Sequence, residues 1–482
     1  MKENSPPLLV ALVPLAFLII LLGTNVSIFG DDALSFSNQI ALLLAAGLGG
    51  LLGRFYGTSF SDLMDGAIDN LKQAVPALIV LLLIGALAGS WLLSGIVPAM
   101  IYYGLKILNP DIFLFASCII CAIVSISTGS SWGTVATVGI ALLGIGKAME
   151  IHEGLVAGAI ISGAYFGDKM SPLSDTTNLA PAVAGTDLLT HIKYMSITTI
   201  PSILISLLIF LIIGFNYDTT FDEASVSELS VLLEQSFDLN PLLFIVPIVV
   251  IGLIVKRIPA APALGVGAIL GIVFAMIFQQ ELIADLVKSE AGGNAYALSL
   301  RALGSDFSIP STNPILAELM STGGMSGMLN TIWLIICAMI FGGVMDRNGC
   351  LKVITGSLLK LATGRTSLIG TTAASSIFMN FTASDQYLAI VVPGKMYEPT
   401  FKERGLHPAN LSRTLEDAGT VTSVLIPWNT CGATQAGVLG VATAVYWPFC
   451  FFCLISPIMT MIMAAFNIRI KKLDDEVNAS ND

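Results

Sequence analysis

A polar run between two long apolar segments carries the residue types that a cation site needs. The run is 167–178, GDKMSPLSDTTN, and it holds two carboxylates, a proline and a series of hydroxyl and amide side chains. Polar groups at membrane depth are costly, and backbone that leaves the helix there lines a cavity or is buried in protein. Side-chain oxygens and freed carbonyls are the ligands that a hard cation such as sodium prefers. The run therefore predicts a cation site inside a membrane.

Asp175 is the first candidate for a sodium ligand. Exchange of sodium for protons requires a carboxylate that binds either ion, and partial desolvation favours its protonated form. Asp175 is followed by side chains whose oxygens suit a hard cation, namely Thr176, Thr177 and Asn178. We therefore expect Asp175 and Asn178 to contact sodium. The same residue types also cap helices, and a broken helix offers both roles.

Asp168 is the second candidate, and its neighbour Lys169 allows two interpretations. If Lys169 neutralises Asp168, the two residues form a structural ion pair. If Lys169 faces the cavity instead, it becomes a contact for a transported anion. Pro172 stands between Asp168 and Asp175 and is expected to break the helix there. The two carboxylates are therefore not expected on one continuous helix face.

Polar segments of related design occur in both halves of the chain. Polar turns occupy 127–134 (STGSSWGT) and 380–387 (NFTASDQY), and a second polar break, 419–430 (GTVTSVLIPWNT), aligns without gaps with 167–178. The candidate ion-binding residues in and next to these segments are Ser130, Ser131, Asn380, Thr382, Ser384, Asp385, Asp417, Asn429 and Thr430. Among them, Asn429 is the expected sodium ligand. Hydrogen bonding between helices also explains such hydroxyls, and Asp417 is either an acid of the site or a solvated residue at a helix start.

The composition defines the class of protein. Hydrophobic residues make up 55% of the chain, charged residues 11%, and the mean hydropathy is +0.84, well outside the range of soluble domains. Several apolar segments approach the roughly 20 residues that cross a bilayer as a helix. The sequence thus predicts an all-α polytopic membrane protein in a lipid bilayer. It has no nucleotide-binding loop and no nucleophile–base spacing, so we expect no enzyme, no cofactor and no nucleic-acid partner.

Basic residues and polar breaks predict the organisation of the chain in the membrane. The positive-inside bias puts Lys2, Arg54, Lys256 and Lys471, and with them both termini, in the cytoplasm. The expected parts are N-terminal spans (1–75), a first repeat (76–215), an acidic loop with linking spans and an extracytoplasmic segment (216–327), a second repeat (328–466) and a cytoplasmic tail (467–482). The two repeats have opposite orientations. Inverted-topology repeats with broken helices and re-entrant hairpins indicate a secondary transporter whose site lies near the membrane midplane.

Two runs of the chain resemble a known family. The runs 167–181 (GDKMSPLSDTTNLAP) and 416–433 (EDAGTVTSVLIPWNTCGA) are similar to the signatures of the NhaC-type sodium/proton antiporters. That family includes sodium-dependent malate/lactate exchangers and belongs to the ion-transporter superfamily. The resemblance implies a scaffold domain that forms a homodimer, a transport domain with two re-entrant hairpins, and elevator-type movement. It also implies a place in the prokaryotic inner membrane.

Two transport functions follow, and sodium is the transported substrate of the leading one. The first is exchange of sodium for protons by alternating access, without an organic substrate. The alternative is sodium- or proton-coupled exchange of small organic anions such as malate and lactate. An anion site needs a cationic side chain or helix N-termini, so the position of Lys169 discriminates between the two. A passive channel or a membrane enzyme is less favoured, because neither needs carboxylates at paired helix breaks.

Overall fold

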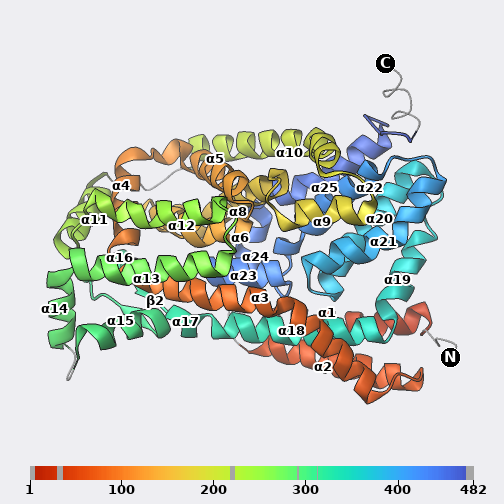
Figure 1. Cartoon of the computed structure of the whole chain (residues 1–482), viewed down its shortest axis with the longest axis horizontal. Coiled ribbons are helices and arrows are strands. Elements are labelled where there is room, and N and C mark those ends of the chain that lie inside the picture. Colours follow the sequence, from red (N-terminus) through yellow and green to blue (C-terminus); the bar gives the residue numbers. More distant parts are fainter. Residues whose placement is uncertain (1–5, 30–35, 218–222, 290–292, 312, 474–482) are drawn as a thin grey trace.

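The computed structural model describes residues 6–29, 36–217, 223–289, 293–311 and 313–473, and in these ranges the chain is almost entirely helical (Figure 1). Residues 218–222 of the expected acidic loop and 474–482 of the expected tail lie outside them. Among the described residues, eight helices are long and apolar enough to cross a membrane, or ten if each of two bent helix pairs is one span. The predicted all-α polytopic membrane class is confirmed.

The N-terminal helices are long because few residues interrupt their apolar sequence. They are α1 (Leu8–Phe29), α2 (Ser37–Phe55), α3 (Phe60–Leu93) and the shorter α4 (Ile96–Ile107). Ser59 and Asp62 cap α3 reciprocally: the Ser59 hydroxyl accepts from the Asp62 backbone N–H at 3.1 Å, and the Asp62 carboxylate accepts from the Ser59 backbone N–H at 3.0 Å. The 34 residues of α3 extend about 50 Å, which is more than a bilayer core requires.

The first hairpin and the first broken helix follow. Their elements are α5 (Pro110–Thr128), α6 (Ser131–Thr134), α7 (Ile140–Ala148), α8 (Glu153–Met170), α9 (Asp175–Ala184) and α10 (Leu188–Asn216). The π-helical residues Val135–Gly139 join α6 to α7. Residues 171–174, around Pro172, leave the helix between α8 and α9, as the proline predicts. The chain therefore breaks at the polar run.

The middle of the chain links the two halves. It contains α11 (Glu223–Ser236), α12 (Ile245–Val255), α13 (Ala260–Phe278), α14 (Gln280–Ser289), α15 (Ala295–Gly304), β1 (Phe307–Ser308), α16 (Pro314–Leu319), β2 (Ser321–Thr322) and α17 (Gly324–Gly327). The two short strands pair antiparallel. The helix α13 packs along α3 and joins the linking segment to the N-terminal spans.

The second half contains the remaining helices. It comprises α18 (Leu329–Arg347), α19 (Cys350–Leu359), α20 (Arg365–Thr382), α21 (Gln386–Glu403), α22 (Pro408–Leu415), α23 (Thr430–Leu439), α24 (Thr443–Tyr446) and α25 (Phe451–Ala465). A π-helical turn, Glu416–Thr420, extends α22, and residues 421–429 then lead to α23. In each half a helical hairpin is followed by a helix with a break, and the inverted repeat itself stays a prediction. The repeat boundaries and the opposite membrane orientations stay predictions.

In Figure 1 the broken helices lie between the long edges of the molecule. In that view α10 follows one long edge, α3 and α18 follow the opposite edge, and α8, α9 and α23 lie between them. The helix α9 packs against both α21 and α22. Elements of the first half therefore meet elements of the second half at the interrupted segments, where the candidate site residues are.

Candidate functional site

The tip of the first hairpin lies directly against the first helix break. Gly129 ends α5 in the left-handed conformation, with φ at 69°. A Cβ atom on Gly129 would lie 2.6 Å from the Leu173 Cβ and 2.9 Å from the Ser174 backbone nitrogen. Ser130 then caps α6, since its side chain accepts from the Gly133 backbone N–H at 3.0 Å. The close approach requires a residue without a side chain at the tip.

Asp168 joins the hairpin tip to the break. It lies in the last turn of α8 and is half-buried. Its Oδ2 atom accepts hydrogen bonds from the Ser131 backbone N–H at 3.0 Å and from the Ser131 hydroxyl at 2.6 Å. Hydrogen bonds to an ionised acceptor are stronger than neutral ones. These hydrogen bonds therefore hold the Asp168 carboxylate between the hairpin tip and the first helix break.

Asp175 lies in the first turn of α9 and is exposed. Ser174 caps this helix, and its hydroxyl lies 3.2 Å from that of Thr176. The Asn178 side chain donates to the carbonyl oxygens of Pro172 at 2.9 Å and Ser174 at 2.7 Å. The helix-capping role and a cation-binding role are thus compatible here.

Thr177 faces away from its neighbours Thr176 and Asn178. Its hydroxyl donates to the backbone carbonyl of Lys169 at 3.0 Å, and the residue is fully buried. This hydrogen bond ties the start of α9 to the end of α8 across the break. Thr177 therefore stabilises the helix break on its buried side.

The second hairpin tip is held by the start of α23. Ser384 has φ at 60°, and its carbonyl accepts from the Thr430 backbone N–H at 2.9 Å. Asp385 caps α21, since its Oδ1 accepts from the backbone N–H groups of Tyr387 at 2.9 Å and Leu388 at 3.1 Å. Its Oδ2 accepts from the Thr430 hydroxyl at 3.5 Å. In each half, therefore, a hairpin tip carries or contacts a carboxylate at the break.

Asn380 and Asn429 brace the second hairpin instead of facing open space. The Asn380 amide donates to the Gly419 carbonyl at 2.6 Å, and the Asn429 amide donates to the Asn380 carbonyl at 3.1 Å. The Asn429 side-chain oxygen accepts from the Cys431 backbone N–H at 3.0 Å and so caps α23. The Thr382 hydroxyl donates to its own helix at Phe378. The side chain of Asn429, expected to contact sodium, is thus occupied by these hydrogen bonds.

A cavity of about 1140 Å³ opens between the hairpin tips and the breaks. Eight of the expected site residues line it: Ser130, Ser131, Asp168, Asp175, Thr176, Asn178, Asp385 and Thr430. Three of these are carboxylates, while the basic residue in the described lining is Arg257, from the link between α12 and α13. A wall with this excess of negative groups favours cations. No three His, Cys, Asp or Glu side chains converge as a metal cluster within the described part of the chain.

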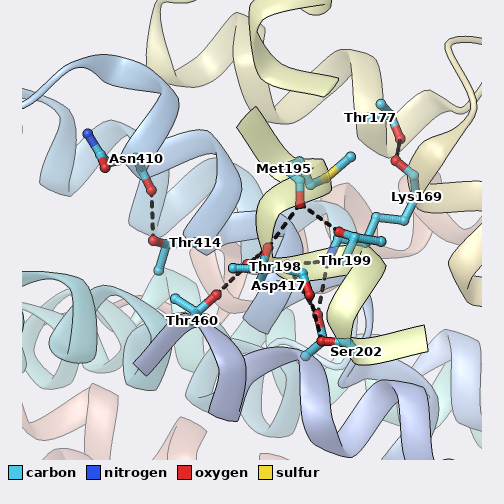
Figure 2. Close-up of polar contacts among 11 residues, drawn as sticks. Lys169, Thr177, Met195, Thr198, Thr199, Ser202, Asn410, Thr414, Asp417 and Thr460 are labelled. Atoms are coloured by element: carbon cyan, nitrogen blue, oxygen red, sulfur yellow. Dashed lines mark hydrogen bonds and ion pairs between the residues drawn. The ribbon is translucent and has the colours of Figure 1, made fainter. Parts of the chain in front are cut away.

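Lys169 and Asp417 do not line the described cavity wall, because they pair with each other behind it. Both side chains are fully buried. The Lys169 ammonium also donates to the Ser456 hydroxyl at 2.9 Å, and that hydroxyl donates to Asp417 Oδ1 at 3.1 Å. Figure 2 shows the hydroxyls of Thr198 and Thr460 on the same carboxylate, with the Thr198 bond at 2.8 Å. Of the interpretations left open, the pairing of Lys169 with Asp168 and the solvated position of Asp417 are both wrong.

Sequence reasoning missed the hydroxyl partners of Asp417. Ser456 and Thr460 lie four residues apart on α25, and Thr198 lies four residues before Ser202 on α10. Residues four apart share a helix face. Hydroxyls at this spacing on otherwise apolar helices were the available signal for a buried polar partner. Arg257 gave no such signal, because it lies in a short link between two helices.

Comparisons with known proteins agree with this architecture. The model of the Na+/H+ antiporter family matches residues 163–468, which hold both breaks. The chain is 37% identical over 459 residues to the Na(+)/H(+) antiporter NhaC of Alkalihalophilus pseudofirmus, covering 95% of this chain and 96% of that protein. It is 35% identical to the Malate-2H(+)/Na(+)-lactate antiporter of Bacillus subtilis, over 93% of this chain and 92% of that protein.

A third relative is an antiporter of other substrates. The chain is 32% identical to the arginine/ornithine antiporter ArcD of Halobacterium salinarum, over 98% of this chain and 95% of that protein. Antiporters of this similarity thus differ in what they exchange. Because the family match covers more than half of the chain and the identities extend over nearly all of it, the chain belongs to the Na+/H+ antiporter family, as its resemblance to the NhaC-type antiporters predicted.

Proposed function

We propose that this chain exchanges sodium for protons across the membrane by alternating access. The observation that carries the proposal is the position of Asp168, a carboxylate at a helix break, anchored by Ser131 of the hairpin tip and open to a cavity. An intramembrane carboxylate at such a place is expected to bind a transported ion. The family supports sodium as that ion.

Sodium first meets exposed side chains on the cavity wall and then binds at the less exposed carboxylate of Asp168. Asp175 and Asn178 are exposed on the cavity wall and meet the hydrated ion first. Asp168 then holds it together with neutral oxygens of the tip and the break, such as those of Ser131 and Thr176. A single carboxylate with several neutral oxygens suits a monovalent cation, which needs less ligand charge than a divalent one.

Alternating access then requires the cavity to open to the other side. The hairpin tips and the breaks contact each other at Gly129 and at Ser384, so they form a connected unit that can move as one body. The elevator movement, the homodimer and the cytoplasmic termini in a prokaryotic inner membrane complete the proposal. They rest on the resemblance to NhaC-type antiporters and on the distribution of basic residues.

The test is uptake of radioactive sodium into proteoliposomes that contain the purified protein. An outward proton gradient should drive sodium accumulation above equilibrium, and a protonophore should abolish it. Empty liposomes and the Asp168→Asn protein are the controls. Sodium uptake that is the same with and without the proton gradient would contradict the proposed exchange.

Exchange of organic anions is the second candidate, and Arg257 on the cavity wall is the observation that favours it. A cationic side chain there can attract a carboxylate substrate. Lys169 does not support this candidate, since its charge is paired with Asp417. If malate or lactate is exchanged, Arg257→Gln should weaken anion-dependent movement and spare movement driven by sodium alone. Equal anion dependence in both proteins would remove Arg257 from consideration.

A further inference from the structure

Glu416 is a buried acid that the exchange described above does not use. It begins the π-helical turn Glu416–Thr420 at the end of α22, and its exposed fraction is 0%. Neither of its carboxylate oxygens has a hydrogen-bond partner among the described residues. An ionised carboxylate without partners is strongly disfavoured away from water. Burial without hydrogen-bond partners therefore favours the neutral, protonated form of this side chain.

Charged groups surround Glu416 on the side of the first break. Lys169 and Asp168, both on α8, and Asp417, from the same turn, act on it through space. A cation favours the ionised form of a neighbouring carboxyl group, and an anion favours its protonated form. Lys169 and Asp417 are already paired with each other. Asp168 is thus the neighbouring charge that changes when an ion enters the cavity.

Arg413 does not neutralise Glu416, although it lies one helical turn earlier. Its guanidinium carbon lies 4.5 Å from the ring centre of Tyr194 on α10, and its nitrogen atoms have no hydrogen-bond partner in the described ranges. Residues three apart on a helix can contact each other, yet these two form no ion pair here. Among the described residues no such pair is present to stabilise the ionised form of Glu416.

The sign of the coupling follows from these charges. Sodium at Asp168 cancels the negative charge that favours the proton on Glu416, so the proton leaves more readily. The O–H bond then breaks, its electron pair stays on the carboxylate, and the proton leaves through water that alternating access must bring to Glu416. Conversely, a proton on Glu416 is favoured when Asp168 is without sodium. Linkage makes this effect reciprocal, and binding of one ion that disfavours the other is what antiport requires.

We infer that Glu416 carries the transported proton and that it is coupled through space to sodium at Asp168. This inference rests on the proposed function and adds a second ion site to it. The competing explanation is that Glu416 is a neutral packing residue. An amide has nearly the shape of a protonated carboxyl group, so Glu416→Gln preserves packing and removes only the ability to release a proton.

The test measures two movements in proteoliposomes of the wild-type and Glu416→Gln proteins. The first is exchange of radioactive sodium for unlabelled sodium at equal concentration and pH on both sides, which moves no net proton. The second is sodium-driven proton movement, followed with a pH-sensitive dye inside the vesicles. Glu416→Gln should keep the first and lose the second. Glu403→Gln, which changes an exposed glutamate at the end of α21, should keep both.

Two results would overturn the inference. If Glu416→Gln moves protons with sodium as the wild type does, Glu416 does not carry them. If a folded Glu416→Gln protein loses sodium exchange as well, the side chain serves sodium and not the proton alone. If Glu416→Gln fails to fold, the Glu416→Asp protein is measured instead. It should retain proton-coupled exchange, but the pH dependence of its exchange rate should be shifted. An unchanged pH dependence contradicts the inference. Absence of sodium-driven proton movement in the wild type would instead refute the proposed function.

Discussion

Lys169 and Asp417 lie 248 residues apart and form an ion pair in which both side chains are fully buried. The pair joins the end of α8, next to the first break, to the turn that precedes the second break. Ser456 and Thr198 add hydrogen bonds from α25 and α10. Because taking two charges out of water is costly, such a pair is tolerated only with its remaining hydrogen bonds satisfied. The pair also removes the charge of Lys169 from the cavity.

Replacing one residue of this pair should destabilise the protein more than the pair's own net contribution to stability suggests, because the other charge stays buried. Lys169→Met or Asp417→Leu alone leaves an uncompensated buried charge, which destabilises a protein by about 3–5 kcal/mol. The double variant should lose less than the sum of the two, and a double-mutant cycle on thermal unfolding in detergent measures the difference. Additive losses would show that the two side chains do not interact in the folded protein.

Asp168→Asn should weaken sodium binding strongly. A hydrogen bond or ligand contact to a charged group contributes about 1.5–3 kcal/mol, so the half-saturating sodium concentration should rise roughly tenfold to hundredfold. Asp175→Asn should raise it less than about fivefold, because Asp175 is exposed and its charge is screened by water. Sodium titration of transport rates in both variants provides the comparison, and the reverse order would make Asp175 the principal ligand.

Gly129→Ala should disrupt the first hairpin tip. The left-handed backbone costs an alanine about 1–2 kcal/mol, and its Cβ would lie 2.6 Å from the Leu173 Cβ. Gly185→Ala is the matched control, since Gly185 has φ at 82° and nothing within 4 Å of an added Cβ. Apparent melting temperatures and sodium uptake should fall further for Gly129→Ala. Equal effects of the two substitutions would mean that the close contact with the break is unimportant.

The positions of the breaks were predictable because the interrupting residues are visible in the sequence. Pro172 stands within the polar run 167–178, and α8 ends two residues before it. Gly129 marks the first hairpin tip and Asp385 caps the helix after the second. Proline and glycine act locally on the backbone, so their effect does not depend on knowing the tertiary packing.

The partners of charged side chains were not predictable in the same way. Lys169 follows Asp168 in the sequence, which suggested an ion pair. Adjacent residues on a helix point about 100° apart, however, and do not face each other. Lys169 therefore reaches Asp417 on the buried side, while Asp168 reaches Ser131 beside the cavity. The Asn429 amide likewise donates to Asn380, a partner that is distant in the sequence, and its expected contact with sodium stays a prediction.

The most direct test of sodium/proton exchange by this chain is sodium-induced collapse of an imposed pH gradient in proteoliposomes, with and without malate and lactate. If the chain exchanges sodium for protons at Asp168, sodium alone collapses the gradient in the wild type, and Asp168→Asn needs much more sodium to do so. Collapse only in the presence of the organic anions, or equal sodium dependence of the two proteins, would contradict it.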